Sequence, residues 1–350
     1  MDPLLEQLEE LQGYHINDSQ KISTLALADG LLLLADNSEK AQELLTHTEI
    51  YLKQFGIKIA PTKCPSFEIK TSKDTWCIAD PGLQLRTKER IPAAPADGSL
   101  TYLGGRLSPW FGLHHSDPKK RIQENLQRLG SSFLKPHQKL SLLSTHIIPH
   151  FFYVNTLTTP PITTIRSMGS IVRTHVKEFL HLPSSTPNGL LYCCKRDGGL
   201  RIPKLEILSI TTALKQGVNL LNTLDPAAQG LFRLTNLEKR LEYLAKSARI
   251  LWPVQNFKSI DAYKRRLKAA ELEQCSKLPY KGKGVLSFAN DRLGNEWLYN
   301  PQLLKPCRFL TALRMKSGTT SDRVTLNKAI PQTAIACRRC NTKLEILAHI

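Results

Sequence analysis

Short apolar runs separated by polar residues mark the first hundred positions, a pattern typical of a mixed helix and strand fold. Residues 3–11 place apolar side chains at helical spacing and predict a helix. The runs 22–28 and 31–35 are largely apolar and flank Asp29 and Gly30. Both central residues of a two-residue hairpin turn must tolerate positive φ, so this Asp-Gly predicts a β-hairpin with the two runs as its arms.

A longer helix and several short strands are expected after this hairpin. Ser38 is predicted to cap a helix that ends before Gly56, because the apolar residues between them recur at helical spacing. Short β-like runs are expected at 57–60, 67–70 and 101–107, with loops rich in Pro and Ala between them. The first part of the chain is therefore predicted to be α+β.

Beyond about Pro118 the pattern becomes helical. Residues 117–134 carry one apolar stripe, which predicts a helix with its charged residues left for solvent or phosphate. The stripe consists of Ile122, Leu126, Leu129 and Phe133. Two further helices are predicted at 136–153 and 163–183, and these are expected to end near Pro149 and Pro183. A turn at 196–203, an apolar helix through about Leu221, and amphipathic segments over 225–330 complete the pattern.

Charge is distributed very unevenly over the 350 residues. The net charge is +18, but residues 1–100 carry 10 Lys and Arg against 15 Asp and Glu, and the remaining 250 residues carry 38 against 15. An asymmetry of this size points to a polyanionic partner for the later part of the chain, and RNA or DNA is the expected one. The alternative is a basic surface that is only solvated.

Several classes of protein are excluded or disfavoured by the sequence. No apolar run approaches the ~20 residues that span a bilayer, so no membrane association is expected. The acidic, amphipathic N-terminus is unlike a signal or transit peptide, which predicts an intracellular protein of the nucleus or cytoplasm. Walker-type loops, GxGxxG and HExxH motifs are absent from the sequence.

Eight cysteines are present, and in an intracellular chain most are expected to be free thiols. Only Cys337 and Cys340 have ligand-like spacing. The histidines at 114, 115, 146 and 150 are interpreted as surface or core residues rather than metal ligands.

Six segments stand in an order that carries a resemblance. They are "LADG" at 27–30, the helix at 37–56 followed by "IKIAPTKC" with Lys63, "TYLGGRL" at 101–107, "LKPHQKLSLLSTHIIPHFFY" at 134–153, "RDGGLRIPKL" at 196–205, and "CRRCNTKLEILAHI" at 337–350. In this order they resemble a reverse transcriptase (Pol) of non-LTR retrotransposons, most closely the site-specific group with a single open reading frame. That family has a Phe/Tyr-Ala-Asp-Asp turn between two apolar strands of the polymerase palm, and in this chain "LADG" takes its place.

The resemblance implies a domain order. We expect an α+β fold in which the C-terminal part of a polymerase palm is followed by a mostly helical thumb and connector, ending in an incomplete zinc knuckle. The expected domains are a partial palm at 1–112, a thumb-like region at 113–222, a basic connector at 223–330 and the start of the knuckle at 331–350. The fingers, the first palm motifs and the endonuclease are expected to be missing.

The resemblance also implies the chemistry of the palm. RNA-directed DNA polymerases use two Mg²⁺ ions, held in this family by carboxylates from the turn and from an earlier strand. Here Asp29 is the sole remaining palm carboxylate, Lys63 matches the lysine of the following motif, and Gly30 replaces the second aspartate. Because only 28 residues precede Asp29, the earlier strand is expected to be missing. The chain is therefore interpreted as a fragment or degenerate copy that is inactive alone and does not bind Mg²⁺ productively.

Binding residues follow from the same comparison. Tyr102, Leu103 and Gly104 match the turn that holds the primer terminus. Phosphate contacts are expected from the cations of the thumb-like region, which are Lys119, Lys120, Arg121, Arg128 and Lys135. The alternative function is a non-catalytic RNA- or DNA-binding protein derived from the polymerase. A larger polyprotein, or a partner that supplies the missing palm strands, is a further expectation.

A zinc site is implied at the end of the chain. Cys337, Cys340 and His349 match three of the four knuckle ligands, and the fourth would fall beyond Ile350. The alternative is two free thiols and an unrelated histidine.

Overall fold

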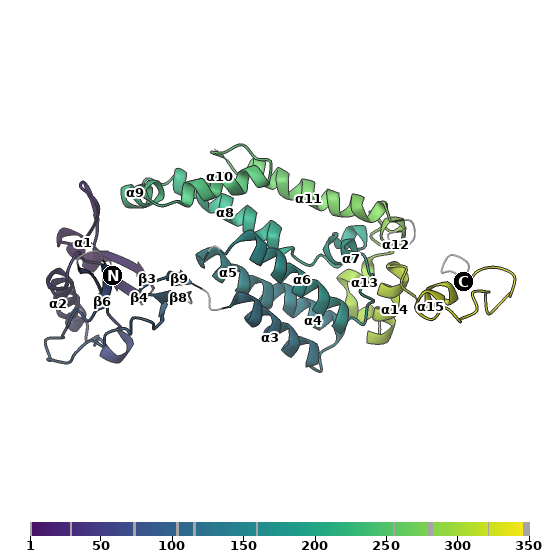
Figure 1. The fold of residues 1–350 in the computed structure, drawn as a ribbon, viewed down its shortest axis with the longest axis horizontal. Helices are drawn as coiled ribbons and strands as arrows, with labels where there is room; N and C mark the ends of the chain where they lie inside the picture. Colours follow the sequence, from purple (N-terminus) through teal and green to yellow (C-terminus); the bar gives the residue numbers. More distant parts are fainter. Residues whose placement is uncertain are drawn as a thin grey trace. The chain divides into compact units, whose positions relative to one another are not determined.

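Short antiparallel strand pairs and longer helices make up the chain, so the fold is α+β as the sequence predicts (Figure 1). The structure is a computed structural model that describes residues 2–28, 30–72, 75–102, 105–114, 117–158, 160–254, 256–278, 283–320 and 322–345. Of the predicted site residues, Asp29, Leu103, Gly104 and His349 lie outside the described residues.

Nine strands form the small sheets of the described chain. They are β1 (Tyr14–Asn17), β2 (Gln20–Ile22), β3 (Thr24–Leu27), β4 (Gly30–Leu33), β5 (Glu68–Ser72), β6 (Thr75–Ala79), β7 (Leu100–Tyr102), β8 (Gly105–Ser108) and β9 (Gly112–His114). The first six pair as successive antiparallel hairpins, and β7, β8 and β9 form a three-stranded antiparallel sheet.

Helices dominate the rest of the described chain. The α-helices are α1 (Asp2–Glu10), α2 (Ser38–Gln54), α3 (Pro118–Ser131), α4 (Pro136–Leu142), α5 (Ile148–Thr158), α6 (Ile162–Phe179), α7 (Asn188–Tyr192), α8 (Leu205–Leu221), α9 (Pro226–Leu234), α10 (Leu237–Ser247), α11 (Lys258–Ser276), α12 (Lys283–Ser287), α13 (Glu296–Tyr299), α14 (Pro306–Lys316) and α15 (Arg323–Ala329). Short 3₁₀ turns are η1 (Pro61–Lys63), η3 (Lys195–Asp197) and η4 (Pro301–Leu303), and η2 (Leu143–Ile147) is a π-helical turn.

The chain divides into two compact units. Unit 1 contains Met1–Ser116, Lys215–Ser247 and Leu251–Gln255, and unit 2 contains Asp117–Leu214, Ala248–Ile250 and Asn256–Ile350. The boundary after Ser116 coincides with the change from short strands to long helices. None of the described helices combines the length and the apolar character needed to cross a membrane.

The predicted β-hairpin is present, but its turn is displaced by one residue. Leu27 pairs with Gly30, so Gly30 begins strand β4 instead of standing in the turn. The left-handed conformation falls on Ala28, with φ of +53°. The Asp-Gly signal located the hairpin correctly and misplaced its centre, because the pairing of apolar residues across the two arms sets the register.

Helix α2 is confirmed, with a correction to its cap. Asn37 rather than Ser38 is the N-cap, and its side chain accepts a hydrogen bond from the amide of Lys40 at 2.9 Å. Asn and Ser are comparable caps, so the sequence alone did not separate two adjacent candidates. One face of α2 packs Leu44 against Leu4 and Leu8 of α1, all fully buried.

The predicted strands of this region are partly corrected. The run at 67–70 corresponds to β5, but residues 57–60 form no strand. They connect the end of α2 to Pro61, and Ile59 packs into the cluster of Leu45, Leu85 and Ile91 without a strand partner. The run at 101–107 belongs to two strands instead of one, since β7 and β8 are antiparallel and Tyr102 pairs with Gly105.

Unit 2 is built around α3 and α6, which lie side by side (Figure 1). Ile122, Leu126 and Leu129 are buried as predicted. The prediction that Phe133 continues this buried stripe is wrong, because Phe133 lies beyond the end of α3 and is fully exposed. Helix α6 agrees with the prediction. Together these helices bury a continuous apolar core that also includes Phe151, Leu190 and Phe309.

The expected stop at Pro149 is also wrong. The helical path continues from α4 through η2 into α5, with Pro149 near the start of α5. In the π-helical turn the amide of Ile148 bonds to the carbonyl of Leu143, five residues back. The wider turn accommodates a ring that has no N–H and would otherwise collide with the preceding turn, so this proline does not end the helix.

Candidate nucleic-acid interface

Helix α3 begins with a strong local start signal. Asp117 is its N-cap, and the carboxylate accepts a hydrogen bond from the amide of Lys120 at 3.0 Å. Pro118 occupies the first turn, where a missing N–H costs nothing. With Ile122 and Leu126 buried on one face, the polar residues of α3 are directed to solvent.

Four predicted phosphate-binding cations are exposed on α3. Lys119, Lys120 and Arg121 lie in its first turn, and Arg128 lies two turns after Arg121, or about 10 Å along the axis. Among the described residues none of these four has a carboxylate partner. Cations at a helix N-terminus oppose the helix dipole, at about 0.3–1 kcal/mol each. The arrangement is unfavourable for stability and favourable for binding an anion.

Arg121 is held in place by a residue that sequence reasoning assigned no function. Its Nη2 lies 3.0 Å from Nε2 of His150 on α5. The ring of His150 packs edge-on against Phe151 at 5.9 Å between centroids, and Phe151 is fully buried in the core. Helix α5 therefore fixes the direction of the Arg121 guanidinium. The only sequence signal was the histidine itself, and spacing alone did not relate it to an arginine 29 positions away.

Lys135 and Lys139 both lie near the start of α4 but have different environments. Lys135 is the exposed N-cap of α4, and its backbone amide donates to Gln138 at 2.9 Å. Burial lowers the pKa of His137, and the charge of Lys135 lowers it further. Lys139 is buried, and its Nζ donates to the carbonyl of Gly130 at 2.6 Å, near the end of α3. Lys135 is therefore available to a ligand, whereas Lys139 stabilises the α3–α4 connection.

In unit 1 the structure describes two of the predicted palm residues. Lys63 is exposed at the end of η1, and its neighbour Cys64 packs in one cluster with Leu33 of β4. Tyr102 ends β7 and is half-buried, and this burial raises the pKa of its hydroxyl. Both residues therefore belong to the unit that carries the β3–β4 hairpin.

Asp36 follows β4 and is fully engaged within the protein. Its carboxylate accepts hydrogen bonds from the amide of His15 at 2.9 Å and from Lys40 at 3.0 Å, and Oδ2 lies 2.6 Å from Nδ1 of His15. Partial burial raises the pKa of Asp36, but these hydrogen bonds and the charge of His15 outweigh burial and lower it to about 2. Asp36 thus stabilises the approach to α2.

The two cysteines near the end of the chain share one tight loop. The amide of Cys337 donates to Lys343 at 2.7 Å, and an isolated bridge joins Ala336 to Leu344. The sulphur of Cys337 accepts a hydrogen bond from the amide of Arg339 at 3.4 Å, and that of Cys340 accepts one from the hydroxyl of Thr342 at 3.3 Å.

The buried side chain of Glu345 stabilises this loop. Its carboxylate accepts hydrogen bonds from the backbone and guanidinium of Arg338 and from the amide of Arg323, and these bonds lower the pKa of Glu345 to about 2. Two thiolates would supply half of the four ligands of a tetrahedral zinc site. Within the described part of the chain no three His, Cys, Asp or Glu side chains are grouped to hold a metal.

Comparison with known proteins gives several related sequences. The Pol polyprotein of a type-1 R2 retrotransposable element from Popillia japonica is 28% identical over 349 residues, which is 97% of this chain and 45% of that protein. The corresponding protein from Nasonia vitripennis is 29% identical over 59% of this chain and 20% of its own length. The R2DM polyprotein of Drosophila melanogaster is 28% identical over 63% of this chain and 21% of its own length. No protein-family model matches the chain.

These relatives define a class of proteins, the Pol polyproteins of retrotransposable elements. More narrowly, the chain is similar to Pol polyproteins of R2 elements, and this similarity supports the resemblance to the non-LTR retrotransposon family. The chain spans less than half the length of each of these three relatives.

Proposed function

We propose that this chain binds the phosphate backbone of RNA or DNA through the exposed cations of α3, without catalysing polymerisation. The observation that carries the proposal is the first turn of α3, where Lys119, Lys120 and Arg121 stand at the positive end of the helix dipole with no carboxylate partner among the described residues. A phosphate placed there would pair with these cations, while Asp117 already caps the helix terminus. The net charge of +18 supports the same conclusion.

The Pol relatives suggest where these elements belong in a polymerase. In this proposal the β3–β4 hairpin, α2 and the β7–β8 turn are the C-terminal part of a palm, and α3 to α6 form the thumb that grips a template–primer duplex. The chain would then be a part or a degenerate copy of an RNA-directed DNA polymerase. Contacts of this kind position a duplex without reading its sequence, so we expect little base specificity.

Binding is tested by fluorescence anisotropy with the full chain and labelled RNA, DNA and RNA–DNA hybrid duplexes. We expect the logarithm of the association constant to fall linearly with the logarithm of salt concentration, with a slope of about −0.9 for each duplex phosphate that is neutralised. Similar affinities are expected for unrelated sequences of equal length. A flat response to salt, or binding confined to one sequence, contradicts the proposal.

Polymerase activity is expected to be absent from the 350-residue chain. Two-metal phosphoryl transfer needs oxygen ligands for both ions, and the β3–β4 turn offers one carboxylate, Asp29, followed by Gly30. The nearby Asp36 is already bonded to His15 and Lys40. Primer extension with Mg²⁺ should therefore equal a no-protein control. Gly30→Asp should not restore it, because both carboxylates would then come from adjacent positions of one hairpin, with none from another strand. Extension by the unmodified pure chain would falsify this assignment.

The loop of Cys337 and Cys340 is proposed as part of a zinc site, with His349 as the third ligand. Zinc bound there would crosslink the end of the chain, because thiolates and imidazole suit a tetrahedral ion. Zinc requires both thiols in their ionised form, and the two sulphurs accept hydrogen bonds from the Arg339 amide and the Thr342 hydroxyl. Glu345 and Arg338 hold the loop in shape whether or not an ion is bound.

A further inference from the structure

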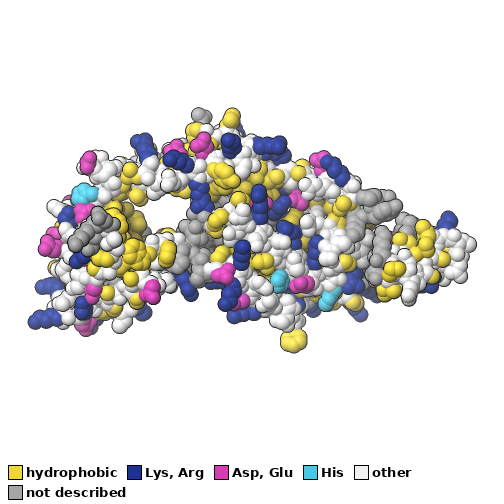
Figure 2. Space-filling model, in the orientation of Figure 1, with side chains coloured by type: hydrophobic (Ala, Val, Ile, Leu, Met, Phe, Trp, Pro, Cys, Tyr) yellow, Lys and Arg dark blue, Asp and Glu magenta, His cyan; other side chains and the backbone are white. Residues whose placement is uncertain are grey.

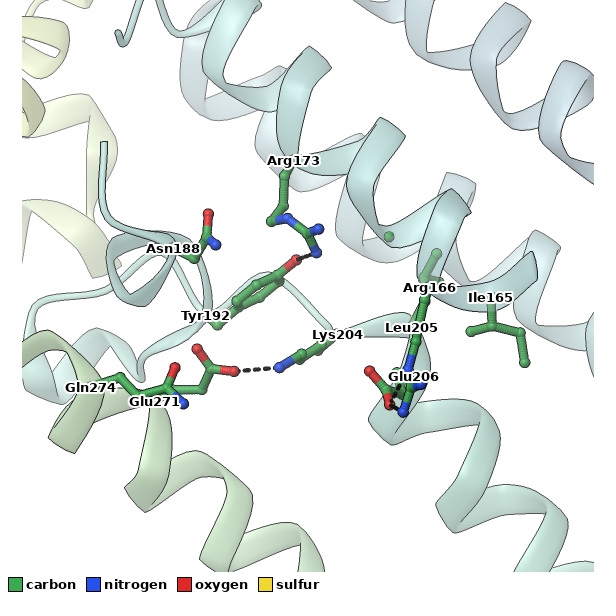
Figure 3. A pocket seen from close by; sticks show the side chains of 11 residues that line it. Ile165, Arg166, Arg173, Asn188, Tyr192, Lys204, Leu205, Glu206, Glu271 and Gln274 are labelled. Atoms are coloured by element: carbon green, nitrogen blue, oxygen red, sulfur yellow. Dashed lines mark hydrogen bonds and ion pairs between the residues drawn. The ribbon is translucent and has the colours of Figure 1, made fainter. Parts of the chain in front are cut away.

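A polar hollow lies beside α6 and is lined by residues for which the sequence predicted no function. It has a volume of about 310 Å³ and is bordered by α6, α7, the start of α8 and α11 (Figure 3). Gly169 forms part of its wall, and a Cβ atom at that position would lie 3.6 Å from Nη1 of Arg173. A methyl group there would make ordinary van der Waals contact with the Arg173 guanidinium, which lies over the preceding turn of α6.

Ion pairs neutralise the acidic groups of this hollow. Lys204 donates to Glu271 at 2.5 Å, and Arg166 pairs with Glu206 at 2.8 Å (Figure 3). Glu271 is buried, so its charge is neutralised by the ion pair with Lys204 rather than screened by water. No acidic group of the hollow is left to attract a second cation.

Arg173 is the exception among the charged residues of the hollow. It is half-buried, and its Nη1 donates to the hydroxyl of Tyr192 at 3.3 Å (Figure 3). Within the described chain it has no carboxylate partner. Tyr192 is itself fixed, because Lys204 lies over its ring at 5.6 Å from the centroid. A guanidinium has five N–H donors, so most of those of Arg173 are free to bind an oxyanion held in the hollow.

A second hollow, of about 340 Å³, continues along the same helix. Arg173 and Asn188 border both hollows, so the two form one groove with Arg173 at its centre. Hydroxyl groups of Ser170, Thr174 and Ser184 line the second part. Lys177 and the carboxylate of Glu178 also border this second part. The central Arg173 and the neutral donors around it suit a phosphodiester group with its attached sugar better than a carboxylate, which has fewer acceptor oxygens.

We propose that this α6 groove binds a phosphate of single-stranded nucleic acid, with Arg173 as the residue that contacts the phosphate and Tyr192 as its positioning residue. The inference rests on the proposed function and adds a second site to it. Hollows near 300 Å³ are at the small end of those that hold organic ligands, so a single nucleotide fits where a rigid duplex does not. The basic face of α3 would hold a duplex, and the α6 groove a single strand.

The test compares Arg173→Gln with a matched variant, Arg292→Gln, in the full chain. Arg292 is an exposed arginine of the same unit that lies 3.8 Å over the ring of Tyr299, so its replacement removes the same charge beside the same kind of residue. Binding of a short fluorescent oligouridylate is measured by anisotropy over a series of salt concentrations. Arg173→Gln should weaken binding about tenfold or more and reduce the salt slope by about 0.7, the value for one phosphate of a single strand.

Arg292→Gln should leave both quantities unchanged, and Arg173→Lys, which keeps the charge, should recover most of the salt slope. Equal losses in the two glutamine variants would overturn the proposal, because they would show a general effect of charge. Duplex affinity separates this inference from the proposed function. If Arg173→Gln leaves single-strand binding intact while the α3 face still binds a duplex, only the groove is wrong.

Inorganic phosphate and an acidic peptide serve as competitors in the same assay. We expect inorganic phosphate to compete only at high concentration. Unlabelled oligouridylate should compete much more strongly. Stronger competition by the peptide would overturn the assignment to nucleic acid. Tight binding of inorganic phosphate without any effect on the oligonucleotide would mean that the groove holds a free anion, which also contradicts the proposal.

Discussion

Replacing the four exposed cations of α3 together is expected to reduce affinity for duplex nucleic acid by two or more orders of magnitude at low salt. The variant carries Gln at Lys119, Lys120, Arg121 and Arg128. With four phosphate contacts the unmodified chain should lose about a hundredfold in affinity between about 50 and 200 mM salt, and the variant should lose much less. Anisotropy with an RNA–DNA hybrid duplex over this salt range measures both quantities.

The same variant should be at least as stable as the unmodified chain. Three of the cations oppose the dipole of α3, so removing them should raise the free energy of unfolding slightly, by about 0.3–1 kcal/mol each at most. Urea denaturation measures this change. A loss of binding together with unchanged or raised stability identifies α3 as a binding surface, whereas parallel losses would show that the cations maintain the fold.

Four other exposed cations of unit 2 provide a matched control. They are Lys258, Arg265, Lys268 and Arg308, each replaced by Gln. The control removes the same total charge from helices α11 and α14, and we expect a small effect on affinity. If it weakens duplex binding as strongly as the α3 variant, binding depends only on net charge and the assignment to α3 fails. Figure 2 shows how widely Lys and Arg side chains are spread over the visible face.

Much of the helical architecture could be predicted because local pattern determined it. The stripe of Ile122, Leu126 and Leu129 is buried as the 3.6-residue period requires. Phe133 continued the same period and is exposed, since α3 ends at Ser131. The period shows which face is apolar, but the end of the helix depends on packing and on Lys139, which bonds to Gly130 from the next helix.

The candidate site was only partly predictable for a related reason. Exposed cations of α3 follow from one helix and its period, so local sequence identified them. The α6 groove depends on Arg173, Tyr192 and Glu271, which are separated by 19 and 79 positions in the chain. No local pattern relates them, and each has an ordinary explanation when taken alone. Contacts of this range become visible only when the helices are placed together.

The glycine pair of the turn at 196–203 shows how a motif can have a structural cause. Gly198 has φ of +83°, and a Cβ atom there would lie 2.5 Å from Cε of Lys316. A Cβ atom at Gly199 would lie 2.3 Å from the carbonyl oxygen of Cys193. The sequence identified a turn, and the structure explains why it contains glycine: the side chain of a buried lysine passes against it.

That buried lysine has an unusual environment. Lys316 ends α14, and its Nζ donates to the side chain of Asn295, which is completely buried. The rings of Phe288 and Trp297 lie 4.8 and 5.6 Å from the ammonium group. Burial lowers the pKa of Lys316 to about 8, although the charge of Asp291 acts in the opposite direction. In the unfolded chain the same group titrates near 10.5.

The free energy of unfolding should therefore rise between pH 8 and pH 10.5 because of this residue. In that interval the unfolded chain binds a proton at Lys316 that the folded chain does not, so raising the pH favours the folded state. The contribution is about 3 kcal/mol when complete, from a difference of some 2.5 pKa units at about 1.4 kcal/mol each. Below pH 8 Lys316 is protonated in both states, so it no longer makes the free energy of unfolding change with pH.

Lys316→Met isolates this contribution from the other groups that titrate at alkaline pH. The variant keeps an unbranched side chain that is one atom shorter, removes the charge, and leaves the Asn295 side-chain oxygen without its lysine donor. Its absolute stability can move either way, because a buried charge and a hydrogen bond are lost together. The informative quantity is the difference between the two proteins in urea denaturation at successive pH values. The unmodified chain should gain on the variant as pH rises above 8, and parallel curves would show that Lys316 keeps an ordinary pKa in the folded protein.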